Sequence, residues 1–304
     1  MGKIAFVFPG QGSQYVGMAK DLYENSDIAR NLIDRANEVL GIDLKKIMFE
    51  GPEETLKQTE YTQPAIFLHS VVLNRLISKV KPEATAGHSL GEYSALVAAE
   101  AIDFDDAIKL VRYRGQAMQK AGVENPGTMA AVVGLTVEQC EKVVEEAKSA
   151  GIVQCANFNS QIQTVVSGSV DGVRKAMEIA KANGAKIVKE LPVSGAFHSP
   201  LMQSAKDTLL EKLSLATFND AKIPVYANVT AKPVTKNNEI KDLLYQQVTA
   251  PVLWVDTILN LYKDGFTEFY EIGPGKVLTG LIKKIVPDAN CYNIDKYEEL
   301  KKYI

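Results

Sequence analysis

The feature that most constrains the fold is the stretch Gly87-His88-Ser89-Leu90-Gly91, which has the Gly-x-Ser-x-Gly pattern of a nucleophile elbow. In such an elbow a short strand turns sharply into a helix, and the serine side chain is exposed at the turn. Glycines on both sides avoid a collision where strand and helix cross. Small residues precede the motif and an apolar helix-forming segment follows it. The context therefore favours a catalytic Ser89 over an ordinary buried turn serine.

Composition excludes several classes of protein. The chain has 304 residues, 46% of them hydrophobic, so it can bury a large core. Its net charge of -3 shows no basic domain of the kind that binds nucleic acid. No stretch reaches the roughly 18 apolar residues of a membrane span, and no signal peptide is recognisable. The odd number and wide spacing of Cys140, Cys155 and Cys291 indicate free thiols. We expect a cytoplasmic protein without nucleic-acid or membrane partners.

Histidine chemistry has only three candidates in this chain, His69, His88 and His198. His69 lies in an apolar helical pattern and is expected to be a packed or half-exposed helix residue. His88 is expected to have a structural role despite its position beside Ser89. His198 lies in a loop between a strand and a helix, where catalytic groups are often found. Of the three, His198 is best placed to serve Ser89 as a base.

Alternating strand and helix patterns predict a mostly parallel sheet covered by helices on both faces. Ser26 is expected to cap a helix that Gly41 ends. Thr62-Gln63-Pro64 is expected to start another helix, with Pro64 near its first turn. Strands are expected over 4–8, 225–229 and 268–272, and helices over 28–40, 62–80, 107–118, 201–213 and 240–248.

Residues 127–191 have a different order of elements. Strands are expected over 129–133, 153–157, 163–167 and 186–191, and helices over 137–150 and 170–183. This β-α-β-β-α-β order is typical of a ferredoxin-like unit. The predicted fold class is therefore α/β: a large domain of residues 1–126 and 192–304 with a mostly parallel sheet, and an inserted ferredoxin-like α+β subdomain of residues 127–191.

The loop Pro9-Gly10-Gln11-Gly12-Ser13-Gln14 follows the first predicted strand. Tyr15 stands where a dinucleotide fingerprint needs its third glycine, and the Gly-Lys-Ser/Thr of a P-loop is missing, so nucleotide binding is rejected. The glycines still allow the backbone to approach a ligand closely, and Gln11 offers an amide that can donate hydrogen bonds.

Taken together, several spaced motifs make the sequence resemble the malonyl-CoA:acyl carrier protein transacylases of fatty acid synthesis over essentially the whole chain. The motifs are Phe-Pro-Gly-Gln-Gly-Ser-Gln at 8–14, Gly-His-Ser-Leu-Gly-Glu-Tyr at 87–93, Arg-Gly-Gln-Ala-Met-Gln at 114–119, Gly-Ala-Phe-His-Ser at 195–199 and Glu-Ile-Gly-Pro-Gly at 271–275. The resemblance implies a hydrolase-like domain with a ferredoxin-like insert. It implies transfer of malonyl from malonyl-CoA to the phosphopantetheine thiol of acyl carrier protein through a malonyl-serine, without a metal or redox cofactor.

The resemblance also implies residue roles. Ser89 would be the nucleophile, and His198 the general base that returns its proton to the leaving thiolate. In this family a backbone carbonyl, here that of Gln247, takes the place of a carboxylate in orienting the imidazole. The backbone N–H groups of Leu90 and Gln11 would hold the oxyanion.

Two further residues are candidates for choosing the acyl group. Malonyl keeps a free carboxylate that the planar guanidinium of Arg114 can bind bidentately, whereas acetyl would leave that charge unpaired. The resemblance favours Arg114 over Arg112, which we interpret as a surface residue. The Phe197 ring resembles the malonyl-type signature of related polyketide acyltransferases, and its bulk predicts malonyl over methylmalonyl. Asn157 either lines the acyl pocket or is a turn residue at a strand end.

Three other functions share parts of this pattern. A serine esterase or thioesterase needs an Asp or Glu between serine and histidine in the chain order, and none has a matching strand-end setting. An inactive carrier-binding module would not need Ser89, His198, Arg114 and Gln11 together. A free-standing malonyl acyltransferase of a polyketide pathway remains an open alternative. We expect a monomer whose partners are malonyl-CoA and acyl carrier protein.

Overall fold

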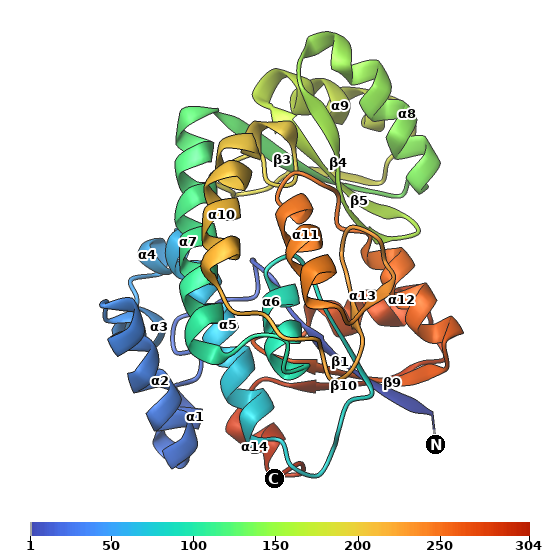
Figure 1. Ribbon diagram of the computed structural model, residues 1–304. Coiled ribbons are helices and arrows are strands. Elements are labelled where there is room, and N and C mark those ends of the chain that lie inside the picture. Colours follow the sequence, from blue (N-terminus) through green and yellow to red (C-terminus); the bar gives the residue numbers. More distant parts are fainter. Residues whose placement is uncertain (1) are drawn as a thin grey trace.

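Two β-sheets organise the computed structural model, which describes residues 2–304 (Figure 1). The larger sheet has the strand order β10-β9-β1-β2-β7-β8. Only β8 runs antiparallel to its neighbour, so the prediction of a mostly parallel sheet is confirmed. Its strands are β1 (Lys3–Phe8), β2 (Ala84–Gly87), β7 (Val225–Tyr226), β8 (Pro233–Val234), β9 (Phe266–Ile272) and β10 (Asn290–Ile294).

The alternation of side chains along β1 explains why helices cover this sheet on both faces. Phe6 and Phe8 belong to one buried apolar cluster, whereas Ala5 and Val7 belong to the other. The first cluster includes buried residues of α5 (Thr59–Leu76), α6 (Gly91–Ala98) and α7 (Phe104–Glu124). The second includes those of α12 (Trp254–Lys263) and α13 (Val277–Ile285). The sheet is therefore the middle layer of three.

The remaining helices lie mainly around the first cluster. Ser26 caps α2 by accepting a hydrogen bond from the Ala29 amide, and Gly41 ends that helix with a φ of 64°, as predicted. The helices are α1 (Lys20–Asn25), α2 (Asp27–Leu40), α3 (Leu44–Glu50), α4 (Glu53–Leu56), α10 (Gln203–Leu215), α11 (Asn237–Gln247) and α14 (Tyr297–Leu300). None of the helices within residues 2–304 is both long and apolar enough to cross a membrane.

Two expectations about α5 and α7 were wrong. The helix expected to begin at Thr62 begins at Thr59, so Pro64 lies inside it. Pro64 has no N–H to pair with the Glu60 carbonyl, and the Arg112 guanidinium donates to that carbonyl instead. Arg112 also pairs with the Glu60 carboxylate at 2.7 Å, and its side chain is only 12% exposed. Arg112 is therefore a packed residue that ties α7 to α5, not a surface residue.

The smaller sheet has the order β4-β5-β3-β6 with antiparallel pairing throughout. Its strands are β3 (Gly127–Val133), β4 (Val153–Ser160), β5 (Gln163–Ser169) and β6 (Ile187–Glu190), joined by α8 (Val137–Ala147) and α9 (Val170–Ala182). This order and pairing confirm the ferredoxin-like insert, which Figure 1 shows beyond one end of the larger sheet. The exact division into residues 1–126 with 192–304 and 127–191 stays a prediction.

Candidate active site

Ser89 lies at the turn between β2 and α6. Its φ of 51° is in the left-handed region, a strained conformation that is often found at functional sites. A Cβ added at Gly87 would lie 1.9 Å from the Gly91 carbonyl carbon, and one added at Gly91 would lie 2.1 Å from the Phe8 carbonyl oxygen. Both positions therefore require glycine, which is the elbow geometry expected from the motif.

The carboxyl ends of parallel strands bring a residue that the sequence analysis missed to this turn. The strand expected over 225–229 ends at Tyr226, so Asn228 lies just beyond it, beside the end of β2. The Ser89 amide donates to Asn228 Oδ1 at 2.7 Å, and Asn228 Nδ2 donates to the Gly87 carbonyl at 2.6 Å. Asn228 therefore holds the elbow on both sides of Ser89.

The Ser89 hydroxyl is hydrogen-bonded to His198 across 109 residues of sequence. Ser89 Oγ lies 2.8 Å from His198 Nε2. On the other side of the ring, His198 Nδ1 lies 2.9 Å from the Gln247 carbonyl oxygen and 3.1 Å from that of Ala250. Carbonyl oxygens only accept, so Nδ1 carries the proton and Nε2 is free to accept the one on Ser89. The imidazole is oriented by carbonyls and not by a carboxylate.

The surroundings of His198 keep it neutral. Burial, with a second contribution from the nearby Arg114 cation, lowers the pKa of His198 to about 3. His198 itself has a φ of 56°. Gln154, on β4, donates to the His198 carbonyl at 2.6 Å and to the Thr249 carbonyl at 3.0 Å. This glutamine, which the sequence analysis did not single out, links the insert to both loops that hold the imidazole.

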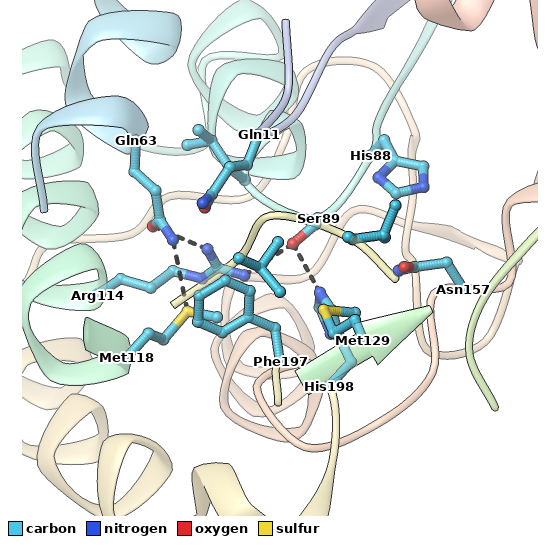
Figure 2. Close-up of a pocket in the computed structure, with 13 residues that line it drawn as sticks. Gln11, Gln63, His88, Ser89, Arg114, Met118, Met129, Asn157, Phe197 and His198 are labelled. Atoms are coloured by element: carbon cyan, nitrogen blue, oxygen red, sulfur yellow. Dashed lines mark hydrogen bonds between the residues drawn. The ribbon is translucent and has the colours of Figure 1, made fainter. Parts of the chain in front are cut away.

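Arg114 is a buried cation without an ionic partner. It is 1% exposed, and Figure 2 shows it beside Ser89 and Gln63. Its Nη1 donates to Gln63 Oε1 at 2.8 Å, and its Nη2 donates to Ser89 Oγ and to Gln247 Oε1, both at 3.0 Å. Its Nε has no partner, and no carboxylate within residues 2–304 forms a salt bridge with it. A buried guanidinium with only neutral partners is suited to an anionic ligand.

The oxyanion donors expected from the resemblance lie at the same edge of the larger sheet. Leu90 precedes the first residue of α6, so its amide is at the positive end of that helix. Neither the Leu90 amide nor the Gln11 amide donates to another group in the described part of the chain. The Gln11 side chain donates to Thr59 Oγ1 at 3.3 Å, which fixes its loop. Two backbone donors are therefore available beside Ser89.

Ser89, His198 and Arg114 line a cavity of about 110 Å³ (Figure 2). Such a volume is far below the ~300 Å³ of an ordinary small-molecule pocket, so it suits a short acyl group. Asn157 lies within β4 and not at a strand end, and it lines this cavity together with Gln11 and Leu90. The apolar part of the wall is formed by Met118, Met129, Leu191, Val193 and Phe197.

The other two histidines are fixed by local contacts. His88 Nε2 lies 2.8 Å from Asn159 Oδ1, and the His88 ring packs 5.6 Å from the Trp254 ring. His69 is fully buried in α5, with its Nε2 2.7 Å from the Asp295 carbonyl. Burial lowers the pKa of both side chains. Neither ring is hydrogen-bonded to Ser89, which leaves His198 as the base candidate.

Glu92 lies under the site on α6, is 3% exposed, and has its pKa raised to about 7 mainly by burial. The unfolded chain restores its ordinary pKa near 4.5, so the charged form costs folding free energy as the pH rises between those values. The unfolding free energy of the Glu92→Gln variant should therefore equal that of the wild type near pH 4 and exceed it by roughly 3 kcal/mol at pH 8. Urea unfolding at both pH values measures this.

The matched control for that measurement is Ser94→Ala, a change on the same buried helix that removes no titratable group. Its unfolding free energy should differ from that of the wild type by the same amount at both pH values. If the unfolding free energy of Glu92→Gln also differs from that of the wild type by the same amount at both pH values, the pKa of Glu92 is not raised.

Comparison with known proteins supports one family. Residues 5–297 match the family described as "Acyl transferase domain". The malonyl CoA-acyl carrier protein transacylase of Bacillus subtilis is 47% identical over 288 residues, which cover 94% of this chain and 91% of that protein. The solved transacylase of the same name from Coxiella burnetii is 40% identical, with a TM-score of 0.96 over 99% of this chain and 96% of that one.

A third relative was solved with a partner. It is a malonyl-transacylase in complex with its type II polyketide synthase acyl-carrier protein, 39% identical, with a TM-score of 0.96 over 99% of this chain and 98% of that one. The match in sequence and in fold extends along nearly the whole chain in each case. The chain belongs to the acyl transferase family, in the group of the malonyl CoA-acyl carrier protein transacylases.

Proposed function

We propose that this enzyme transfers the malonyl group of malonyl-CoA to the phosphopantetheine thiol of acyl carrier protein, through an ester on Ser89. The observation that carries the proposal is Arg114, a buried cation with only neutral partners that donates to the nucleophile's own oxygen at 3.0 Å. The free carboxylate of malonyl supplies the missing negative charge. The names of the relatives point to the same substrate and carrier.

The first half-reaction uses the Ser89–His198 pair. Ser89 Oγ attacks the thioester carbonyl carbon as its proton passes to His198 Nε2, and the carbonyl becomes an oxyanion. The amides of Leu90 and Gln11 donate to that oxyanion, and the Gln247 carbonyl stabilises the imidazolium through Nδ1–H. The C–S bond then breaks, and the coenzyme A thiolate takes the proton from Nε2. The products are malonyl-Ser89 and free coenzyme A.

The second half-reaction reverses these steps with a different thiol. The carrier's thiol gives its proton to His198 Nε2 while its sulfur attacks the malonyl ester, and Ser89 leaves by taking the proton back. Both half-reactions consist of acyl transfer and proton transfer between groups of this chain and its substrates. The proposal therefore includes no metal or redox cofactor.

The proposal keeps two further expectations. One chain supplies all the groups of the mechanism, so the mechanism needs no second copy, and we keep the expectation of a monomer. The three cysteines are unpaired, which is typical of a reducing compartment such as the cytoplasm. We assign the malonyl-carrier product to fatty acid synthesis. Malonyl transfer to a polyketide carrier is the second candidate, because one of the relatives with the same fold was solved with such a carrier.

The test is a transfer assay with malonyl-CoA and holo-acyl carrier proteins, which carry a free phosphopantetheine thiol, from a fatty acid and a polyketide system. We expect the fatty acid carrier to gain one malonyl group as free coenzyme A appears in equal amount. Faster charging of the polyketide carrier would reassign the pathway. Release of free malonate without charging of either carrier would favour a thioesterase, and no reaction at all would favour an inactive carrier-binding module.

Phe197, which is 6% exposed in the cavity wall, should set the choice between malonyl and methylmalonyl. Replacing it with serine removes the ring beside the substrate's α-carbon, so the preference for malonyl should narrow by about tenfold or more. Competition between the two coenzyme A esters measures this. Met118→Leu is the control, because it keeps the volume of another wall residue and should leave the preference unchanged. An unaltered preference in Phe197→Ser would contradict the role of the ring.

A further inference from the structure

We propose that Glu92 is a positioning residue for the proposed malonyl transfer: it fixes the Gln247 side chain, and through it both Arg114 and the Ser89 elbow. The inference rests on the proposed function and adds to it a residue that touches neither the substrate nor the reacting atoms. Glu92 lies on the first turn of α6, three residues after Ser89, with its side chain buried.

One oxygen of Glu92 accepts two hydrogen bonds from different parts of the chain. Glu92 Oε2 accepts from Gln247 Nε2 at 2.6 Å and from the backbone N–H of Asn228 at 3.2 Å. Gln247 is the last residue of α11, and Asn228 belongs to the loop after β7. A single carboxylate oxygen therefore joins the elbow helix to the two segments that support Ser89 and His198.

Gln247 carries this constraint to the reacting groups. Its Nε2 also donates to the Ser89 carbonyl at 3.0 Å, and its Oε1 accepts from Arg114 Nη2 at 3.0 Å. Its backbone carbonyl accepts from His198 Nδ1. The side chain and the backbone of one glutamine thus hold both the acyl-selecting cation and the base.

The Glu92 carboxylate and the Ser89 carbonyl together determine which way the Gln247 amide faces. The ionised Glu92 carboxylate can only accept, so it requires the NH₂ end of the amide and leaves the oxygen end for Arg114. A flipped amide would place its NH₂ against the guanidinium, where both groups are donors, and its oxygen against the carboxylate. Both contacts would be lost in a buried site, so Glu92 helps the Ser89 carbonyl to fix one amide orientation.

The Gln247 side chain also separates Glu92 from the part of Arg114 that would bind the substrate. Arg114 and Tyr93 are the charged and titratable groups that interact electrostatically with Glu92. A carboxylate bonded directly to Arg114 would compete with the malonyl carboxylate, whereas the neutral Gln247 amide does not. Because the Gln247 amide lies between them, Glu92 forms no hydrogen bond with Arg114 and leaves the guanidinium free to bind the acyl group.

The test compares Glu92→Met, which keeps the volume but removes the acceptor, with Glu92→Gln, whose amide oxygen can replace Oε2 in both bonds. The two readouts are the rate of malonyl transfer and the preference for malonyl-CoA over acetyl-CoA in competition. The control is Ser94→Ala, because Ser94 is equally buried on α6 and its hydroxyl has no partner in the described chain. Thermal unfolding of each variant reports its folded state.

We expect Glu92→Met to lower malonyl transfer by about 100-fold, the effect of displacing reacting groups by about an ångström. Its malonyl preference should fall as well, because Arg114 loses its fixed amide partner, and Glu92→Gln should restore both readouts. A folded Glu92→Met with wild-type rate and preference overturns the inference. So does a Glu92→Gln as impaired as Glu92→Met, since it keeps the acceptor.

If Glu92→Met does not fold, Gln247→Met removes the other end of the same hydrogen bond and leaves the backbone carbonyl for His198. It must then lower the malonyl preference, and an unchanged preference overturns the inference. The proposed function fails separately, when the wild type itself does not charge the carrier.

Discussion

Replacing Arg114 with alanine should lower malonyl transfer by about 10²–10⁴-fold, since it removes two charge-assisted hydrogen bonds of roughly 1.5–3 kcal/mol each. Acetyl transfer should stay level or rise, because acetyl has no carboxylate and the variant no longer keeps an unpaired charge in the pocket. The preference for malonyl should therefore collapse. Initial rates with malonyl-CoA and acetyl-CoA, each with the same carrier, measure this directly.

Two variants control for loss of charge and for damage to α7. Arg114→Lys keeps a cation but not the planar fork, so it should recover only part of the malonyl rate. Arg112→Ala removes an arginine from the same helix that pairs with Glu60 and not with the pocket. It should lower stability while leaving the malonyl preference intact. An Arg114→Ala enzyme that still prefers malonyl as strongly as the wild type would contradict the assignment of this cation.

Replacing His198 with alanine should lower both half-reactions by about 10²–10⁴-fold, the usual contribution of a positioned base. The oxyanion donors remain, so a residual rate should persist. His69→Gln is the matched control, because that histidine is buried outside the cavity beside Asp295. The transfer rate of His69→Gln per folded molecule should equal that of the wild type. A loss comparable to that of His198→Ala would show that the rate depends on a buried histidine as such and not on a histidine beside Ser89.

The lowered pKa of His198 adds a pH test to the same experiment. A base is active when it is unprotonated, and His198 stays unprotonated from neutral pH down to about 3. Release of coenzyme A in the first half-reaction should therefore lose no activity through protonation of His198 between pH 8 and pH 5. A fall centred near pH 6.5 that disappears in His198→Ala would instead indicate a histidine with an ordinary pKa.

The elbow and the order of elements could be predicted because they depend on local pattern. Gly87 and Gly91 are required by sterics at the turn itself, and the β-α-β-β-α-β order of the insert follows from short-range periodicity. The ends of elements were less predictable. Pro64 reads as a first-turn residue, yet Arg112, 52 residues along the chain from Glu60, satisfies the Glu60 carbonyl that proline leaves open and lets the helix start earlier.

The supporting polar residues of the site could not be predicted from sequence. Gln63, Gln154 and Asn228 carry no motif of their own, and each meets its partner over 44 to 141 residues of sequence. Glu92 belongs to the elbow motif, but an acidic residue in the first turn of a helix normally faces solvent. Only the folded chain shows that it is buried and bonded to Gln247.

The most direct test of the central claim is intact-protein mass spectrometry after brief incubation with malonyl-CoA, on the wild type and on Ser89→Ala. The account predicts a gain of one malonyl group on the wild type only, mapped to the peptide that contains Ser89 and discharged when acyl carrier protein is added. An adduct that also forms on Ser89→Ala, or one that water removes as fast as the carrier does, would contradict a malonyl-Ser89 intermediate in carrier transfer.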